Sequence, residues 1–115
     1  MGGMKIYHLK NCDTCRKAVK AIAAAGHTPE LVDVRADGVS LAELEKIAEL
    51  AGWEAMLNTR STTWRGLDEA DKEGLDGSKA LGLIAKHPTL LKRPVIMDGG
   101  KLTIGWKAEQ QSAWL

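Results

Sequence analysis

Two cysteines, Cys12 and Cys15, lie where a short β-prone segment is followed by a helix-prone one, and this junction constrains the fold more than any other stretch. Residues 5–9 are Lys-Ile-Tyr-His-Leu, and residues 18–25 are rich in alanine. The pattern predicts a strand that ends before Cys12 and a helix that begins at the cysteines. Because the first amides of a helix have no intrahelical partner and carry a partial positive charge, a thiol placed there ionises more readily.

The spacing makes the two cysteines inequivalent. Cys15, Val19 and Ile22 fall at i, i+4 and i+7, which places them on one apolar helix face. Cys12 precedes the first turn, so we expect it to be the nucleophile and Cys15 to be a resolving thiol. Three other interpretations stay open, namely a small core residue at Cys15, two inert thiols, and half of a zinc site. We expect no metal, because the chain has no second pair of cysteines and no two neighbouring histidines.

Length and charge narrow the function classes. We expect residues 1–115 to form a single domain, which is long enough for its own core. The formal net charge of +1 gives no overall field that attracts nucleic acid or an anionic membrane. No apolar run approaches the length of a membrane span, and we expect no secretion signal before the first strand. Two cysteines without an export signal predict a cytoplasmic protein, in which such a pair is catalytic, sensing or metal-binding.

The first third of the chain predicts a βαβ unit. The first helix is expected to begin at Asp13 or Thr14, both good capping residues, and to end near Gly26. A second strand over 30–34 follows, and a connection of this length makes the two strands parallel. A turn at residues 37–38 then ends the unit.

Residues 40–90 are predicted to be mostly helical. Ser40 and Glu43 form a capping box. The residues expected to be buried by the helix that follows are Leu41, Leu44, Ile47, Ala48 and Ala51. A polar, hydroxyl-rich loop then carries Arg60, which is either a solvated surface arginine or a fork for an oxyanion.

The end of the chain predicts a β-hairpin, with strands over 95–97 and 101–104, and a weak helix over 107–115. A thioredoxin-like fold has this order of elements. It would be an α/β domain with a mixed four-stranded sheet and a helical insertion, at about 40–90, between the βαβ and ββα halves. In that fold a cis-proline before the third strand faces the thiol, and Pro94 has that place. The alternative is a trans proline that opens an edge strand.

A set of motifs resembles the arsenate reductase-related branch of the thioredoxin superfamily, and the YffB-type proteins in particular. That branch also includes the glutaredoxin-coupled arsenate reductases (ArsC) and the redox regulator Spx. The resemblance extends from about Met4 to Trp106. The motifs that carry it are residues 10–14, 52–55, 57–60, 62–65, 92–94 and 104–106.

The resemblance implies roles for individual residues. Cys12 matches the cysteine with which the arsenate reductases attack the oxyanion, and Arg60 and Arg93 match two arginines that hold it. Thr14 and Arg16 match the anion loop after that cysteine. The histidine near the arsenate reductase thiol is matched by His8, whereas His27 and His87 match nothing functional and are expected at the surface.

Two departures from the family pattern bear on the activity. The arsenate reductases carry a third arginine near the segment that matches residues 102–105, which contains no basic residue here. Cys15 is absent from the arsenate reductases and present in Spx, where the pair forms a regulatory disulfide and the protein binds an RNA polymerase subunit.

We therefore expect a thiol-disulfide oxidoreductase that resembles the glutathione- or glutaredoxin-coupled arsenate reductases. Glutathione would be a co-substrate, a small oxyanion or thiol the substrate, and no cofactor would be bound. One alternative is an Spx-like sensor in which a Cys12–Cys15 disulfide controls binding to RNA polymerase. Another is a family member that kept the fold and lost the activity.

Overall fold

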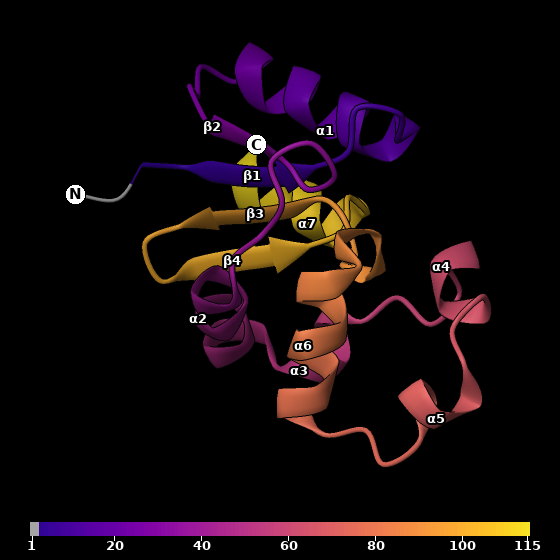
Figure 1. The fold of residues 1–115 in the computed structure, drawn as a ribbon. Helices are drawn as coiled ribbons and strands as arrows, with labels where there is room; N and C mark the ends of the chain where they lie inside the picture. The colour runs from indigo at the N-terminus through magenta and orange to yellow at the C-terminus, as the bar shows by residue number, and fades with distance from the viewer. Residues whose placement is uncertain (1–2) are drawn as a thin grey trace. The chain divides into compact units, whose positions relative to one another are not determined.

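The computed structural model describes residues 3–115, and the chain forms two compact units (Figure 1). The first unit comprises the described residues up to Asp37 together with Arg93–Leu115, and the second is Gly38–Lys92. The second unit corresponds to the segment in which the sequence predicts a helical insertion, and a single domain over the whole chain stays a prediction. No helix within residues 3–115 combines the length and the apolar character that a membrane span requires.

The first unit is a mixed four-stranded sheet with two helices, which is a thioredoxin-like fold. Its elements are β1 (Lys5–His8), α1 (Asp13–Ala24), β2 (Glu30–Asp33), β3 (Val95–Asp98), β4 (Lys101–Ile104) and α7 (Ala108–Trp114). The strand order is β2-β1-β3-β4, in which β1 and β2 are parallel and the other two pairs are antiparallel. The predicted βαβ unit and hairpin are therefore both present.

Both helices of this unit pack on the same face of the sheet. Ile6 of β1 pairs with Ile96 of β3, so their side chains lie on one face. The buried residues of the cluster that covers them are Met4, Ile6, Ile22, Ile96 and Trp114, with Val19, Trp106 and Ala113 packed against it. Because Ile22 belongs to α1 and Trp114 to α7, this cluster packs both helices against the sheet.

The C-terminal helix is held by a contact that the sequence pattern does not reveal. Trp114 is 8% exposed, and its indole N–H donates to Oγ1 of Thr103 at 2.7 Å. The ammonium group of Lys101 lies 4.3 Å from the centre of the same ring. The expectation that His27 is a surface residue is wrong in part, since it is half-buried and its Nε2 lies 3.2 Å from the Trp114 carbonyl oxygen.

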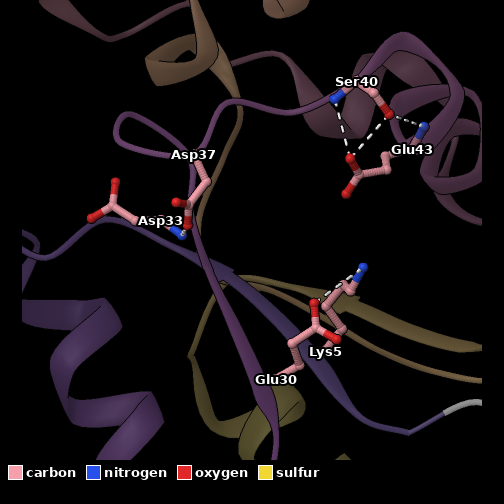
Figure 2. Close-up of polar contacts among 6 residues, drawn as sticks. All are labelled: Lys5, Glu30, Asp33, Asp37, Ser40 and Glu43. Atoms are coloured by element: carbon pink, nitrogen blue, oxygen red, sulfur yellow. Dashed lines mark hydrogen bonds and ion pairs between the residues drawn. The ribbon is translucent and has the colours of Figure 1, made fainter.

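The end of β2 is shaped by two aspartates (Figure 2). Oδ1 of Asp33 accepts hydrogen bonds from the amides of Arg35 and Ala36, each at 2.9 Å. The amide of Asp33 in turn donates to Oδ2 of Asp37 at 2.9 Å. The turn consequently spans residues 34–37, so it overlaps the predicted turn at 37–38 only at Asp37 and ends one residue earlier.

The second unit is helical. Its elements are α2 (Leu41–Ala51), α3 (Trp53–Met56), α4 (Thr62–Arg65), α5 (Glu69–Lys72), α6 (Gly77–Lys86) and the 3-10 helix η1 (Pro88–Leu90). The predicted capping box is present, with Oγ of Ser40 accepting from the Glu43 amide at 3.1 Å and the Glu43 carboxylate accepting from the Ser40 amide at 3.2 Å (Figure 2). The helix buries Leu44 and Ile47 as predicted.

One predicted core residue of α2 is exposed. Leu41 is 49% exposed, although it has the right helical spacing. Side chains on a helix point back toward its N-terminus, so the side chain of this first residue projects past the end of the helix instead of onto its neighbours. Ala48 and Ala51 are half-buried.

The capping box yields a stability prediction. We expect Ser40→Ala to lower the free energy of unfolding by about 1 kcal/mol, because an amide of the first turn of α2 loses its acceptor. Urea denaturation followed by circular dichroism measures it. The matched control is Ser78→Ala, the same change at an exposed position in the first turn of α6, which should alter stability by less than about 0.5 kcal/mol. Equal effects of the two changes would refute the role of the cap.

Candidate active site

Cys12 occupies the N-cap position of α1, immediately before its first residue, Asp13. The expectation that Asp13 or Thr14 caps the helix is therefore wrong, although the helix does begin at Asp13. The amide of Cys12 donates to the Leu9 carbonyl at 3.1 Å, and its carbonyl accepts from the Arg16 amide at 3.0 Å. No side-chain oxygen caps α1, so the first amides of the helix remain available to the half-buried sulfur of Cys12.

The surroundings of Cys12 favour its thiolate. Partial burial raises the pKa of the thiol, but hydrogen bonds from the Cys15 amide and the Cys15 thiol, the positive charge of Arg93 and the Thr14 amide act in the opposite direction. Their combined effect outweighs burial and lowers the pKa of Cys12 below its ordinary value. The contribution of Thr14 comes from its backbone, whereas sequence reasoning had assigned a role to the residue in an anion loop.

The surroundings of Cys15, in contrast, favour its protonated thiol. Cys15 is completely buried, as its place on the apolar face of α1 predicts. Burial raises the pKa of Cys15, the Leu9 amide and the charge of Arg93 lower it, and the hydrogen bond to Cys12 and the charge of Cys12 also raise it. The net result is a pKa of about 11. Both cysteines are free thiols, so the site is a dithiol in which one sulfur is accessible and the other is not.

Arg93 and Pro94 bring a distant part of the chain to the cysteines. The Arg93–Pro94 peptide bond is cis, and the sequence had predicted a cis-proline at this place. The carbonyl of Pro94, which is buried, accepts from the Gly105 amide at 2.9 Å and so ties the start of β3 to the end of β4. The half-buried Arg93 lies close enough for its charge to act on both cysteines.

His8 and Asp33 form a buried polar pair at the carboxyl ends of the two parallel strands. They are register partners on β1 and β2, and they are 9% and 7% exposed. The Ala36 amide lowers the pKa of Asp33, burial opposes it, and the amides of Arg35 and Lys10 and the charge of His8 lower it further. The Asp33 carboxylate is thus ionised and held by the turn, next to the strand that leads to Cys12.

Two of the three predicted anion-binding arginines are solvent-exposed. Arg16 forms an ion pair with Asp13 one turn earlier on α1. Arg60 belongs to the second unit, where its amide donates to Oδ1 of Asn58 at 3.1 Å and its carbonyl accepts from Nη2 of Arg65 at 2.9 Å. Its backbone is therefore held in a tight turn, while its side chain is exposed.

Within residues 3–115, no three or more side chains of His, Cys, Asp and Glu are arranged so that they could hold a metal ion. Inside the first unit the structure thus brings Cys12, Cys15 and Arg93 together, with His8 at the end of the adjoining strand. Sequence reasoning missed the Cys15 thiol as a donor to Cys12. The spacing of the pair at the start of a helix was the signal that could have shown it.

The chain is similar in sequence and fold to several known proteins. A family model described as the ArsC family matches residues 7–114. An uncharacterised protein of Haemophilus influenzae is 44% identical over 108 residues, which are 94% of this chain and 95% of that protein. An arsenate reductase of Neisseria meningitidis is 30% identical over 118 residues, with both chains fully covered. The Global transcriptional regulator Spx of Streptococcus mutans is 33% identical over 107 residues, which are 91% of this chain and 77% of the regulator.

A solved structure of a YffB protein is 35% identical and superimposes with a TM-score of 0.90, covering 97% of this chain and 98% of the other. The agreement extends over nearly the whole chain in both sequence and fold. This protein is a member of the ArsC family.

Proposed function

We propose that this protein is a thiol-disulfide oxidoreductase in which Cys12 is the nucleophile and glutathione the co-substrate. One observation carries the proposal. The sulfur of Cys12 is accessible and lies among the first amides of α1 and near the charge of Arg93, which lower its pKa. A thiolate with a lowered pKa is the reactive form in thiol-disulfide exchange. Membership of the ArsC family supports the assignment.

The reaction is an exchange of sulfur-sulfur bonds. The Cys12 thiolate attacks the glutathione sulfur of a mixed disulfide, so that a Cys12–glutathione bond forms, the original disulfide breaks, and the substrate sulfur leaves as a thiolate that takes a proton from water. A second glutathione thiolate then attacks the glutathione sulfur of this adduct and releases the Cys12 thiolate. The substrate is reduced to a thiol, and the glutathione of the mixed disulfide leaves bonded to the second glutathione as glutathione disulfide, so each turnover consumes one glutathione thiol.

Cys15 acts in this scheme as a hydrogen-bond donor. With a pKa of about 11 and a completely buried sulfur, it is protonated at neutral pH and poorly placed to attack an adduct. Its thiol instead donates to the sulfur of Cys12 and stabilises the thiolate. Glutathione is therefore the better resolving thiol, and the scheme fits the cytoplasm, where thiols are kept reduced.

The basic residues near the thiol hold the negative group of the substrate. Arg93 has a second task there, because the same charge that favours the thiolate attracts an incoming anion. The family resemblance implies that the exposed guanidinium group of Arg60 is a second group that binds the anion. Thr14, Arg16 and His8 complete the set that the family resemblance implies.

Arsenate is the second substrate to test, since one relative is named an arsenate reductase. Residues 102–105 contain no basic residue, however, where the arsenate reductases are expected to have a third arginine. A glutathione mixed disulfide needs no such fork, because its reacting atom is a neutral sulfur. We therefore expect turnover of glutathione disulfides to exceed that of arsenate.

A redox sensor is the second candidate function. It is favoured by the contact between the Cys12 and Cys15 thiols and by the similarity to proteins named Spx. Oxidation by glutathione disulfide would form the Cys12–Cys15 bond, and two glutathione thiols would leave with the electrons and protons of the pair. The bond would alter a surface that binds RNA polymerase. Redox-dependent binding to purified RNA polymerase, without reductase turnover, would favour this function.

The role of Cys15 can be tested by the reactivity of Cys12. We expect Cys15→Ala to raise the pKa of Cys12 and slow its alkylation at neutral pH, because a donor to the thiolate is lost. Cys15→Ser keeps a donor and should stay nearer the unaltered protein, whereas Arg93→Gln should also raise the pKa. The rate of reaction with iodoacetamide across pH, followed by mass spectrometry, measures this. Cys15→Ala with an unchanged profile would show that the Cys15 thiol does not stabilise the anion.

The assignment of the nucleophile is tested by turnover. We expect Cys12→Ser to lower reduction of a glutathione mixed disulfide by a factor on the order of 10³ or more, because the attacking sulfur is lost. Cys15→Ser, the same change three residues later, should retain most of the activity. The assay follows glutathione disulfide formation with glutathione as the reductant. If the two variants lose activity equally, Cys15 resolves the adduct; if Cys12→Ser stays active, the proposal fails.

A further inference from the structure

Asp33 lies where the two parallel strands of the first unit end. It pairs in register with His8, and the Val34 amide donates to the His8 carbonyl at 2.9 Å as the strands part. Where a strand ladder ends, the backbone amides that follow need another acceptor. The side chain of Asp33 is only 7% exposed, so its carboxylate in turn needs donors from within the protein.

The carboxylate of Asp33 bonds both of the segments that leave these strands. Its Oδ1 accepts from the amides of Arg35 and Ala36, each at 2.9 Å, in the segment after β2. The carboxylate also accepts from the Lys10 amide, in the segment that joins β1 to α1. Residues 9–11 line one hollow of about 330 Å³ together with Asp33, Arg35 and Ala36. Asp33 therefore ties the segment before α1 to the end of β2.

The peptide group between Leu9 and Lys10 links Asp33 to the reactive cysteine. Its N–H, that of Lys10, donates to Asp33, and its carbonyl, that of Leu9, accepts from the Cys12 amide at 3.1 Å. Because a trans peptide group is planar, its N–H and C=O point in opposite directions and cannot turn separately. A bond from the N–H to a carboxylate also polarises the group, which makes the carbonyl a stronger acceptor. Asp33 thus fixes the acceptor that holds the backbone of Cys12.

The same segment also contacts the buried cysteine. The Leu9 amide donates to the sulfur of Cys15, and the Cys15 thiol donates to the sulfur of Cys12. Cys12 itself has the extended backbone of an N-cap residue, with φ −100° and ψ 116°, and its sulfur receives the amides of Thr14 and Cys15. A displacement of Leu9 would therefore reach Cys12 by two routes, through its backbone amide and through the thiol of Cys15.

We propose that Asp33 is a positioning residue for the nucleophile, and that it acts on Cys12 through the Leu9–Lys10 peptide group. The inference rests on the proposed function, in which Cys12 reacts as a thiolate, and adds a residue to it. Asp33 exchanges no proton in the reaction and touches no substrate. Its negative charge alone would disfavour a nearby thiolate, so any benefit to Cys12 must come from the hydrogen bonds.

The test measures the pKa of Cys12 in the full chain from its rate of alkylation by iodoacetamide across pH. Asp33→Ala should raise the midpoint by about 0.5 pH units or more, because the Lys10 amide loses its acceptor and the Leu9 carbonyl is no longer fixed. Asp33→Asn keeps one acceptor oxygen and should give a smaller rise. A direct effect of the charge would instead lower the midpoint in both variants.

The matched control is Asp37→Ala, the same change in the same turn (Figure 2). Oδ2 of Asp37 accepts from the Asp33 amide at 2.9 Å, so this change also removes a hydrogen bond from the turn. In the part of the chain that the structure describes, however, Asp37 makes no bond to residues 9–11. It should move the midpoint of Cys12 by less than about 0.2 pH units.

Amide hydrogen exchange, followed by NMR, tests the link itself. The amides of Lys10 and Cys12 should be protected in the unaltered chain, since each donates a hydrogen bond. Asp33→Ala should speed the exchange of both amides about tenfold or more, whereas Asp37→Ala should leave both nearly unchanged. Unprotected exchange of the Lys10 amide in the unaltered chain would overturn the proposal.

A folded Asp33→Ala protein with an unchanged or lower midpoint would also overturn it, and so would an equal effect of Asp37→Ala. Should Asp33→Ala not fold, the sign of the change in Asp33→Asn decides, because a raised midpoint supports the positioning role and an unchanged or lowered one contradicts it. An ordinary midpoint in the unaltered chain would refute the proposed function instead, while exchange of the Lys10 and Cys12 amides would still report the positioning.

Discussion

The chemistry of this protein depends on the hydrogen bonds that the sulfur of Cys12 receives at the start of α1. Most helices satisfy their first amides with a side-chain oxygen, but here the capping position is occupied by a cysteine that makes no such bond. The amides therefore favour the negative charge of the thiolate. Burial opposes this effect, and the charge of Arg93 and the thiol of Cys15 help to reverse it.

The fold brings the start of α1 and the distant residue Arg93 to one sulfur. β1 and the cluster around Ile22 fix the start of α1, and the contacts of Trp114 hold α7 against the same core. Arg93 lies just before β3 and supplies its positive charge to the sulfur of Cys12, although it is about 80 positions further along the chain. The two cysteines then differ because α1 turns one of them into the core and leaves the other at its end.

Local patterns predicted much of this arrangement. The capping box at Ser40, the hairpin between β3 and β4 and the inward face of Cys15 all follow from residues close together in sequence, where a few physical rules decide the outcome. The prediction that Leu41 is buried was wrong because periodicity does not show where a helix begins relative to its neighbours. The anchoring of α7 by Trp114 was missed because it depends on partners from β4. The proximity of Arg93 to Cys12 is a long-range contact that came only from the family resemblance.

The most direct test of the central claim is the titration of Cys12 in the folded chain and in the same chain unfolded in urea, followed by the NMR signal of its ¹³Cβ. Our account predicts a lower midpoint in the folded chain, because the amides of α1 and the charge of Arg93 act on the sulfur only there. A midpoint in the folded chain equal to or above that of the unfolded chain would contradict it, since burial would then dominate and no activated thiolate would exist.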